Sequence, residues 1–316
     1  MSTDTDADPL RWHVGLVGYG EVGRILAEDL RTRGVERVTA YDVKLDGPDA
    51  GSLRAHAAVH GVALADSHAA LAAQADFVVS AVTASQAVAV AAACAPALRR
   101  DAWFLDFNSA SPGAKRSAAA QVAQTGARYV EGAVMTSVPP YRIRVPLLLG
   151  GPHAAALAPL LAVLGFAAKP GPAELGIASA TKMCRSVMIK GLEAMVIESF
   201  TAARAWGVED DVLASLAETF PGIDWEKQAS YFFERVILHG RRRAEEMRES
   251  ANTVRAAGLE PWSAAGTANR QAWVAELAAR GVFSSTPAGG GEPLVDARAD
   301  WRVQADRILA AGEKER

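Results

Sequence analysis

The chain has 316 residues, half of them hydrophobic, which predicts two domains with well-buried cores. A formal net charge of −3 and a pI near 6.1 argue against binding to nucleic acid or to an anionic lipid surface. No apolar run approaches the roughly twenty residues of a membrane span. The acidic, polar start Met1–Pro9 resembles a disordered tail rather than a signal peptide, and Cys94 and Cys184 are the only cysteines. We therefore expect a cytoplasmic protein.

The first half of the chain alternates short apolar runs with Ala-rich helical stretches. Strands are predicted at residues 13–17, 37–42, 76–82, 103–107, 128–134 and 145–149. Helices are predicted at residues 21–33, 51–59, 67–74, 85–98, 112–125 and 154–164. Strands that alternate with helices of this length predict right-handed βαβ units and a mostly parallel sheet.

The pattern changes near residues 169–172, and almost no strand signal follows. Helices are predicted at residues 173–206, 210–220, 225–257, 261–280 and 296–311, with a Ser/Pro/Gly linker at Ser284–Pro293. The predicted fold class is thus α/β: a Rossmann doubly wound domain (residues 11–170) followed by an all-helical substrate and dimerisation domain (residues 171–316). The long Ala- and Leu-rich helices carry more apolar surface than one sheet edge covers, so we expect a homodimer.

A glycine pattern G-x-G-x-x-G follows the first predicted strand and opens the first predicted helix. Its first glycine permits a tight turn, the second lets the backbone approach a pyrophosphate, and the third lets helix and strand pack closely. The helix N-terminus offers unpaired N–H groups to the anion. The alternative is a turn whose glycines serve packing only. The predicted dinucleotide-binding residues are Gly18, Tyr19, Gly20, Glu21, Val22 and Gly23.

An acid ends the second predicted strand about twenty residues beyond the glycines, as a ribose-binding residue does. This residue, Asp42, can accept hydrogen bonds from the adenosine 2′-OH and would repel a 2′-phosphate, which favours NAD over NADP. Lys44 follows in the same loop and can reach a phosphate, so NADP remains the alternative cofactor.

A lysine suited to proton transfer lies in the long helical stretch of the second half. Small residues precede Lys182 by one helical turn, while Arg185 and Ser186 share its helical face. The alternative is a solvated lysine on a long helix.

These motifs resemble the β-hydroxyacid dehydrogenases, relatives of 3-hydroxyisobutyrate and 6-phosphogluconate dehydrogenases, from about residue 13 to about residue 200. That family carries Gly-x-Gly-x-x-x-Lys with an Asn one turn later, matched here by Gly176, Ala178, Lys182 and Ser186. The resemblance implies that Lys182 is the general acid/base. It also implies nicotinamide contacts around Asn108 and Ser109, after the fifth strand, and cofactor contacts at Val82 and Thr83 after the fourth.

The chain departs from that family at the substrate loop, which usually holds Ser-Gly-Gly. The corresponding stretch, residues 131–140, supplies Gly132, Ala133 and Thr136 as candidate substrate-binding residues. The turn after the fifth strand adds Ser109, and the lysine motif adds Ser186. If residues 141–145 are extended, Arg142 and Arg144 face one side, where one of them pairs with an acidic substrate or both are solvated.

Further along, the segment from His239 to Met247 resembles a subgroup with its own helical C-terminal domain. Family members carry a lysine from a later helix near the substrate, and Arg242 is the nearest match here. The alternative is i,i+4 ion pairing of Arg241–Arg243 with the following glutamates on a solvated face.

Together these features predict an NAD-dependent oxidoreductase that interconverts a small, anionic 3-hydroxy acid and its aldehyde or keto form. The alternatives are an imine reductase on the same fold and a non-catalytic nicotinamide-binding sensor. No metal is expected, because the six histidines show no metal-ligand spacing.

Overall fold

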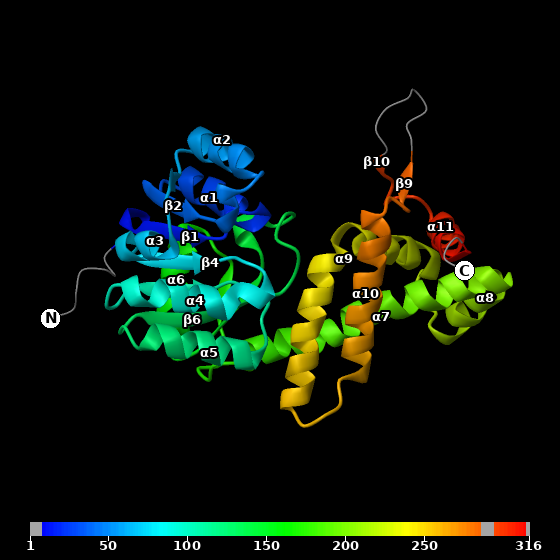
Figure 1. The fold of residues 1–316 in the computed structure, drawn as a ribbon. Coiled ribbons are helices and arrows are strands. Elements are labelled where there is room, and N and C mark those ends of the chain that lie inside the picture. The colour runs from blue at the N-terminus through cyan, green and yellow to red at the C-terminus, as the bar shows by residue number, and fades with distance from the viewer. Residues whose placement is uncertain (1–7, 286–293, 314–316) are drawn as a thin grey trace. The chain divides into compact units, whose positions relative to one another are not determined.

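The computed structural model describes residues 8–285 and 294–313, which form two compact units (Figure 1). The units divide between Met183 and Cys184, inside one long helix, whereas the sequence placed the domain boundary at residue 170. The first turns of that helix therefore belong with the sheet. Most of Met1–Pro9 and of the linker Ser284–Pro293 lies outside the described residues, so those two predictions stay untested.

The first unit is built on an eight-stranded sheet of order β3-β2-β1-β4-β5-β6-β7-β8. Every neighbouring pair is parallel except β6 and β7, which run antiparallel. This arrangement confirms the predicted Rossmann sheet. The sequence missed β3 and β8, which have only two and three residues and so show little periodicity. The strands are β1 (His13–Val17), β2 (Arg37–Tyr41), β3 (Ala63–Leu64), β4 (Phe77–Ser80), β5 (Trp103–Asp106), β6 (Arg128–Val134), β7 (Leu147–Gly150) and β8 (Ala168–Pro170).

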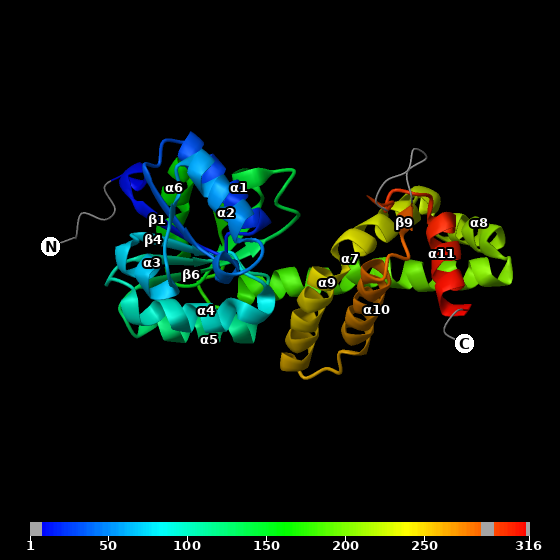
Figure 2. The same ribbon diagram turned by 45° about the horizontal axis from the view of Figure 1, so that its top comes forward.

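Helices cover both faces of this sheet (Figure 2). One core cluster joins the sheet to apolar residues of α1, α2 and α6, and the other joins it to α3, α4 and α5. The helices are α1 (Glu21–Thr32), α2 (Ala50–His60), α3 (His68–Gln74), α4 (Ala87–Cys94), α5 (Pro112–Ala123) and α6 (Ala154–Leu164). Short 3-10 turns lie at η2 (Pro9–Arg11), η3 (Val43–Asp46), η4 (Ala84–Gln86), η5 (Ala95–Ala97) and η6 (Arg142–Arg144).

The second unit is helical, as predicted, apart from one two-residue strand pair. Its core contains Phe200, Phe233 and Trp301, with the Phe200 and Trp301 ring centroids 5.0 Å apart. The helices are α7 (Ile177–Trp206, whose first turns lie in the first unit), α8 (Glu209–Thr219), α9 (Trp225–Ala256), α10 (Trp262–Ala279) and α11 (Trp301–Glu313); the strands are β9 (Ser284–Ser285) and β10 (Leu294–Val295).

Helices α9 and α10 pack closely as a hairpin. A Cβ atom added at Gly240 would lie 2.7 Å from the carbonyl oxygen of Gln271, so this helix crossing requires glycine. Two buried ion pairs reach α9 from α7, Arg243 with Glu193 and Lys190 with Glu246. Each of these four charged side chains thus has a partner of opposite charge inside the second unit.

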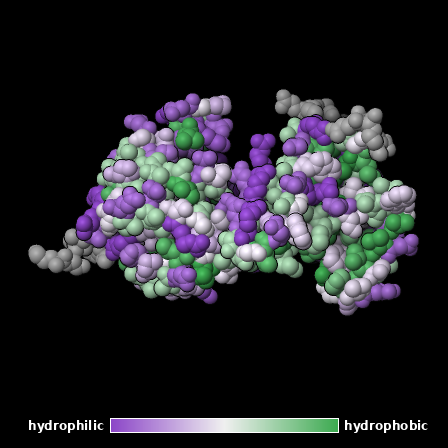
Figure 3. Space-filling model, turned by 60° about the horizontal axis from the view of Figure 1, so that its bottom comes forward, coloured by the Kyte–Doolittle hydropathy of each residue, from purple (hydrophilic) through white to green (hydrophobic). Residues whose placement is uncertain are grey.

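Large apolar side chains also remain exposed on the helical unit. On α7, Met188, Met195 and Trp206 are each more than 60% exposed. Apolar residues gather in green areas at the right of Figure 3. Among the described helices, none combines the length and the apolar character needed to cross a membrane.

Candidate functional site

The glycine turn joins β1 to α1 next to β4, where the strand order of the sheet reverses. A Cβ atom at Gly18, where φ is +90°, would lie 2.4 Å from the Ala81 carbonyl oxygen, and one at Gly23 would lie 2.0 Å from that of Gly18. A Cβ atom at Gly20 meets no atom within 4 Å. The first and third glycines are thus required by packing, while the second leaves open the space where a pyrophosphate would approach the backbone.

The N-terminus of α1 is left available for an anion. Its N-cap residue is Gly20, which has no side chain to accept hydrogen bonds from the N–H groups of the first turn. Such N–H groups, with the helix dipole, favour a phosphate at this position. The turn therefore fits the pyrophosphate of a dinucleotide.

Asp42 is fixed beside this turn by two backbone hydrogen bonds. Its Oδ2 accepts from the N–H of Tyr19 at 2.7 Å, and its Oδ1 accepts from the N–H of Lys44 at 3.0 Å. The Lys44 ammonium lies 3.2 Å from a carboxylate oxygen of Asp49. The acid is held at the end of β2, and the neighbouring cation has an acidic partner of its own.

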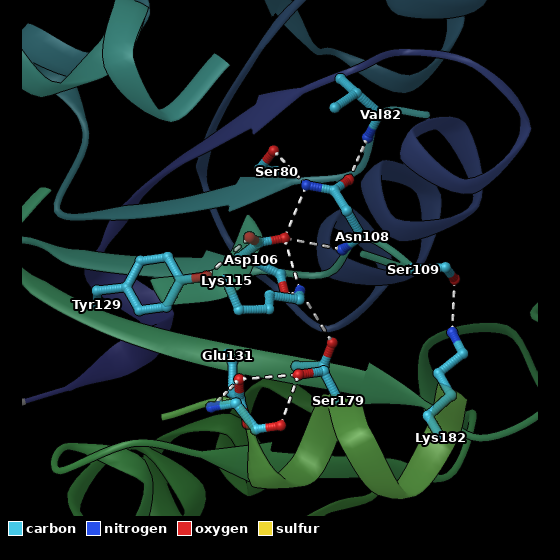
Figure 4. A network of polar contacts seen from close by, with 12 residues as sticks. Ser80, Val82, Asp106, Asn108, Ser109, Lys115, Tyr129, Glu131, Ser179 and Lys182 are labelled. Carbon is cyan, nitrogen blue, oxygen red and sulfur yellow. Dashed lines mark hydrogen bonds and ion pairs between the residues drawn. The ribbon is translucent and has the colours of Figure 1, made fainter. Parts of the chain in front are cut away.

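Asn108 connects the turn after β5 to the turn after β4 (Figure 4). Its Oδ1 accepts a hydrogen bond from the N–H of Val82 at 2.7 Å, while its Nδ2 donates to Ser80 Oγ at 2.9 Å and to Asp106 Oδ1 at 2.7 Å. The side chain is buried. Asn108 thus holds together the two turns that edge the predicted nicotinamide position, and its own contact with a cofactor stays a prediction.

A buried ion pair lies behind Asn108. The ammonium of Lys115 is 2.8 Å from Asp106 Oδ1 and also donates to the Asp106 carbonyl oxygen, and both side chains are 1% exposed. Tyr129 donates its hydroxyl to Asp106 Oδ2 at 2.8 Å. Burial, together with the carboxylate of Asp106, raises the pKa of Tyr129 well above its usual value, which keeps this phenol a donor. Because every charge here has partners, the network fixes the ends of β5 and β6.

Glu131 of β6 caps the start of α7, the helix that carries Lys182 (Figure 4). The carboxylate is fully buried and accepts from the N–H groups of Gly176 and Ala178, both at 2.9 Å, and from Ser179 Oγ at 3.3 Å. A carboxylate at this end of a helix also complements the helix dipole. The start of α7 is therefore fastened to the sheet.

Lys182 extends from α7 to the turn after β5. Its Nζ donates to Ser109 Oγ at 2.5 Å (Figure 4). The sequence predicted both residues for the site, and the fold brings them together across 73 positions of the chain. The lysine amine thus contacts the residue that follows Asn108, at the same edge of the sheet as the glycine turn.

Comparison with known proteins agrees with this geometry. Residues 13–168 match the NAD binding domain of 6-phosphogluconate dehydrogenase, and residues 203–274 match a domain of unknown function, DUF1932. A conserved hypothetical protein from Sinorhizobium meliloti 1021 is 38% identical, with a TM-score of 0.69 over 93% of this chain and 96% of that chain. The chain belongs to the β-hydroxyacid dehydrogenase family.

Two further structures place it within this family's fold. A conserved protein of unknown function, described as structurally similar to 3-hydroxyacid dehydrogenases, is 29% identical, with a TM-score of 0.63 over 84% of this chain and 98% of its own. The 3-hydroxyisobutyrate dehydrogenase of Mycobacterium tuberculosis, solved with L-serine, has a TM-score of 0.63 over 95% of this chain and 99% of its own. At 18% identity, that second likeness concerns the fold alone.

The stretch that matches the substrate loop of the β-hydroxyacid dehydrogenases lies partly inside the sheet. Gly132 and Ala133 are buried residues of β6, paired with Leu149 and Leu148 of β7. Their backbone is paired in the strand ladder with β7, and the substrate contact predicted for these two residues stays a prediction. Thr136 lies beyond the strand and is exposed, so its predicted role remains open.

The segment after this loop contacts α1 rather than extending toward a ligand. Residues 142–144 form η6, so the extended conformation that would turn Arg142 and Arg144 to one side is not adopted. The guanidinium of Arg142 lies 2.6 Å from Glu28 Oε2 and 2.8 Å from Asp29 Oδ1, and the N–H of Ile143 donates to Asp29 at 2.9 Å. Arg142 and Arg144 are both exposed, as one of the two alternatives expected, and Arg142 in addition makes ion pairs with α1.

The two remaining predicted substrate residues belong to the helical unit. Ser186 is buried on α7, and Arg242 of α9 makes a 2.6 Å ion pair with Glu246, four residues later. The i,i+4 pairing expected for this segment is therefore confirmed for Arg242. It is wrong for Arg243, which is buried against Glu193. The substrate roles of Ser186 and Arg242 stay predictions.

Sequence reasoning missed the polar side chains that support the site, above all Asp106, Lys115, Tyr129 and the capping role of Glu131. One signal was available for Glu131, because an acid inside a strand that reads as buried needs partners. The sequence did not reveal that those partners are N–H groups 45 and 47 residues away.

Proposed function

We propose that this chain is a nicotinamide-dependent dehydrogenase that interconverts a small, anionic 3-hydroxy acid and its aldehyde or keto form. The observation that carries the proposal is the 2.5 Å hydrogen bond from Lys182 Nζ to Ser109 Oγ. This hydrogen bond fixes an amine at the turn after β5. Asn108 ties that same turn to the turn after β4. Membership of the β-hydroxyacid dehydrogenase family supports this reaction class.

A nicotinamide cofactor, held by the glycine turn and Asp42, would supply the hydride acceptor for oxidation of the carbinol and the hydride donor for the reverse reduction. Lys182 takes the hydroxyl proton in its neutral form and returns a proton to the carbonyl oxygen on reduction. Ser109 orients the amine, because its hydroxyl oxygen accepts one of the three ammonium hydrogens. Glu131 holds the helix on which Lys182 lies, so the amine keeps its place through turnover.

The catalytic proposal is tested by NADH formation with a panel of 3-hydroxy acids. Lys182→Ala should lower kcat by about 10²- to 10⁴-fold, the usual contribution of general acid–base catalysis. Lys169→Ala is the matched control, because this lysine is exposed on β8 and should leave the rate unchanged. A normal rate in Lys182→Ala would refute the acid/base role.

The panel also separates the alternatives. Turnover of cyclic imines, retained in Lys182→Ala, would identify an imine reductase instead. Cofactor binding without turnover of any substrate class would identify a sensor.

We further propose that the cofactor is NAD. The Asp42 carboxylate is held next to the turn, where it can accept from ribose hydroxyls and would repel a 2′-phosphate, and Lys44 is paired with Asp49. Fluorescence titration should therefore show tighter binding of NADH than of NADPH. Asp42→Ala should reduce that preference, whereas the exposed neighbour Asp46→Ala should not. An equal or reversed preference in the native protein would contradict the assignment.

A further inference from the structure

Three metal-ligating side chains meet between α1 and α2, outside the proposed catalytic site. Glu28 comes from α1, while His56 and His60 are one turn apart on α2. One donor atom from each of the three lies within 4.8 Å of the other two, and all three residues are partly buried. The expectation that the histidines show no ligand spacing is therefore wrong, because His56 and His60 have the i,i+4 spacing that places two imidazoles on one helical face.

Each of two ligand candidates already has an outer partner. His56 Nε2 lies 2.9 Å from Glu28 Oε1, and its other ring nitrogen, Nδ1, lies 2.8 Å from the hydroxyl of Tyr19. The other oxygen of Glu28, Oε2, accepts from Arg142 at 2.6 Å. Metal-binding histidines and carboxylates are typically oriented by such second contacts, which leave the ligating atom directed at the ion.

We propose that Glu28, His56 and His60 bind a divalent transition-metal ion, Zn²⁺ being the best match. Two imidazoles and one carboxylate are a typical zinc donor set, and three protein ligands leave a fourth tetrahedral position for water. Zinc bonds of about 2.0–2.2 Å require ligand atoms about 3.4 Å apart. The pair His56–Glu28 is already close to that separation, and rotation of the His60 ring brings in the third ligand.

Metal binding at Nε2 moves the hydrogen of the neutral His56 ring from Nε2 to Nδ1. In the metal-free site His56 and Glu28 share a hydrogen on Nε2, and Tyr19 then donates to Nδ1. When Nε2 ligates the ion, the ring carries its hydrogen on Nδ1 and donates it to the Tyr19 hydroxyl oxygen.

This site adjoins the cofactor turn through Tyr19. The backbone N–H of Tyr19 donates to Asp42, while its side chain reaches His56. The proposed metal site is thus one hydrogen bond away from a residue inside the glycine motif. The inference does not depend on the proposed reaction, because it concerns α1 and α2 and its tests measure metal binding alone.

The test uses the full chain, free of any histidine tag and treated with a chelator, titrated with Zn²⁺ by calorimetry. The native protein should bind one Zn²⁺ per chain, and Co²⁺ should give the visible absorption of a tetrahedral site. His60→Ala and Glu28→Gln should each weaken Zn²⁺ binding by more than about 100-fold, because each removes a ligand. His153→Ala is the matched control, since this histidine is also partly buried but lies beside Trp103.

Tyr19→Phe tests the outer contact separately. Loss of a second-shell partner typically weakens metal binding by about 10- to 100-fold, so this variant should lie between the native protein and His60→Ala. Circular dichroism checks that each variant is folded. Equal Zn²⁺ affinity for native protein and His60→Ala would show an adventitious ion only and would overturn the proposal.

Discussion

The buried carboxylate of Glu131 should contribute strongly to stability, which Glu131→Gln can measure. Glutamine keeps one carbonyl oxygen but turns the other acceptor into an NH₂ group, which then faces the N–H of Gly176 or Ala178. One hydrogen bond to a charged group is lost, about 1.5–3 kcal/mol, together with part of the charge–dipole interaction at the start of α7. We expect the free energy of unfolding to fall by about 3 kcal/mol.

Urea unfolding followed by circular dichroism measures this loss. With slopes of about 1–3 kcal/mol per molar urea, the midpoint should fall by about 1–3 M. Glu174→Gln is the control, because this exposed glutamate two residues before Gly176 should change stability by no more than about 0.5 kcal/mol. If the two variants are equally stable, the argument that Glu131 fastens α7 to the sheet is wrong.

Three further predictions concern the rest of the chain. Burial raises the pKa of the Cys94 thiol to about 12. A thiol reagent should therefore label only Cys184 in the native protein and both cysteines in denaturant. Two rapidly reacting thiols in the native protein would contradict the buried position of Cys94. Burial lowers the pKa of His13, His68 and His153, which means that the folded state favours the neutral form of each ring. Their contribution to the free energy of unfolding should be complete above pH about 6.5 and should decline below it. Stability should therefore fall more steeply in acid than it does in a variant with Gln at all three positions. The exposed apolar residues of the helical unit predict a homodimer in light scattering, and a monomer would refute this expectation.

The parts of the molecule that follow from local pattern were predictable from sequence. The glycine turn, its strand and its helix are adjacent in the chain, so spacing alone placed Gly18, Gly20 and Gly23. Lys182 was found through its motif, and its partner Ser109 through a second motif. Short strands such as β3 were missed, because two residues carry no measurable period.

The parts that depend on contacts between distant residues were not predictable. The loop around Arg142 forms η6 because Glu28 and Asp29 of α1 hold its guanidinium, a contact across more than 110 positions. The grouping of His56 with Glu28 has the same origin, because the acid lies on another helix. A single sequence records which residues can pair but not which elements the fold sets side by side.

The cap formed by Glu131 has a consequence for how this chain can vary in evolution. A Cβ atom added at Gly150 would lie 2.3 Å from Glu131 Oε1, so any side chain at position 150 displaces the carboxylate. The two positions face each other across the antiparallel pair β6–β7. Among relatives, we expect an alanine at position 150 only where a smaller residue replaces the glutamate, and a different group then has to cap α7. The pair should therefore change together or not at all, and its covariation would identify, from sequence alone, which relatives anchor this helix in the same way.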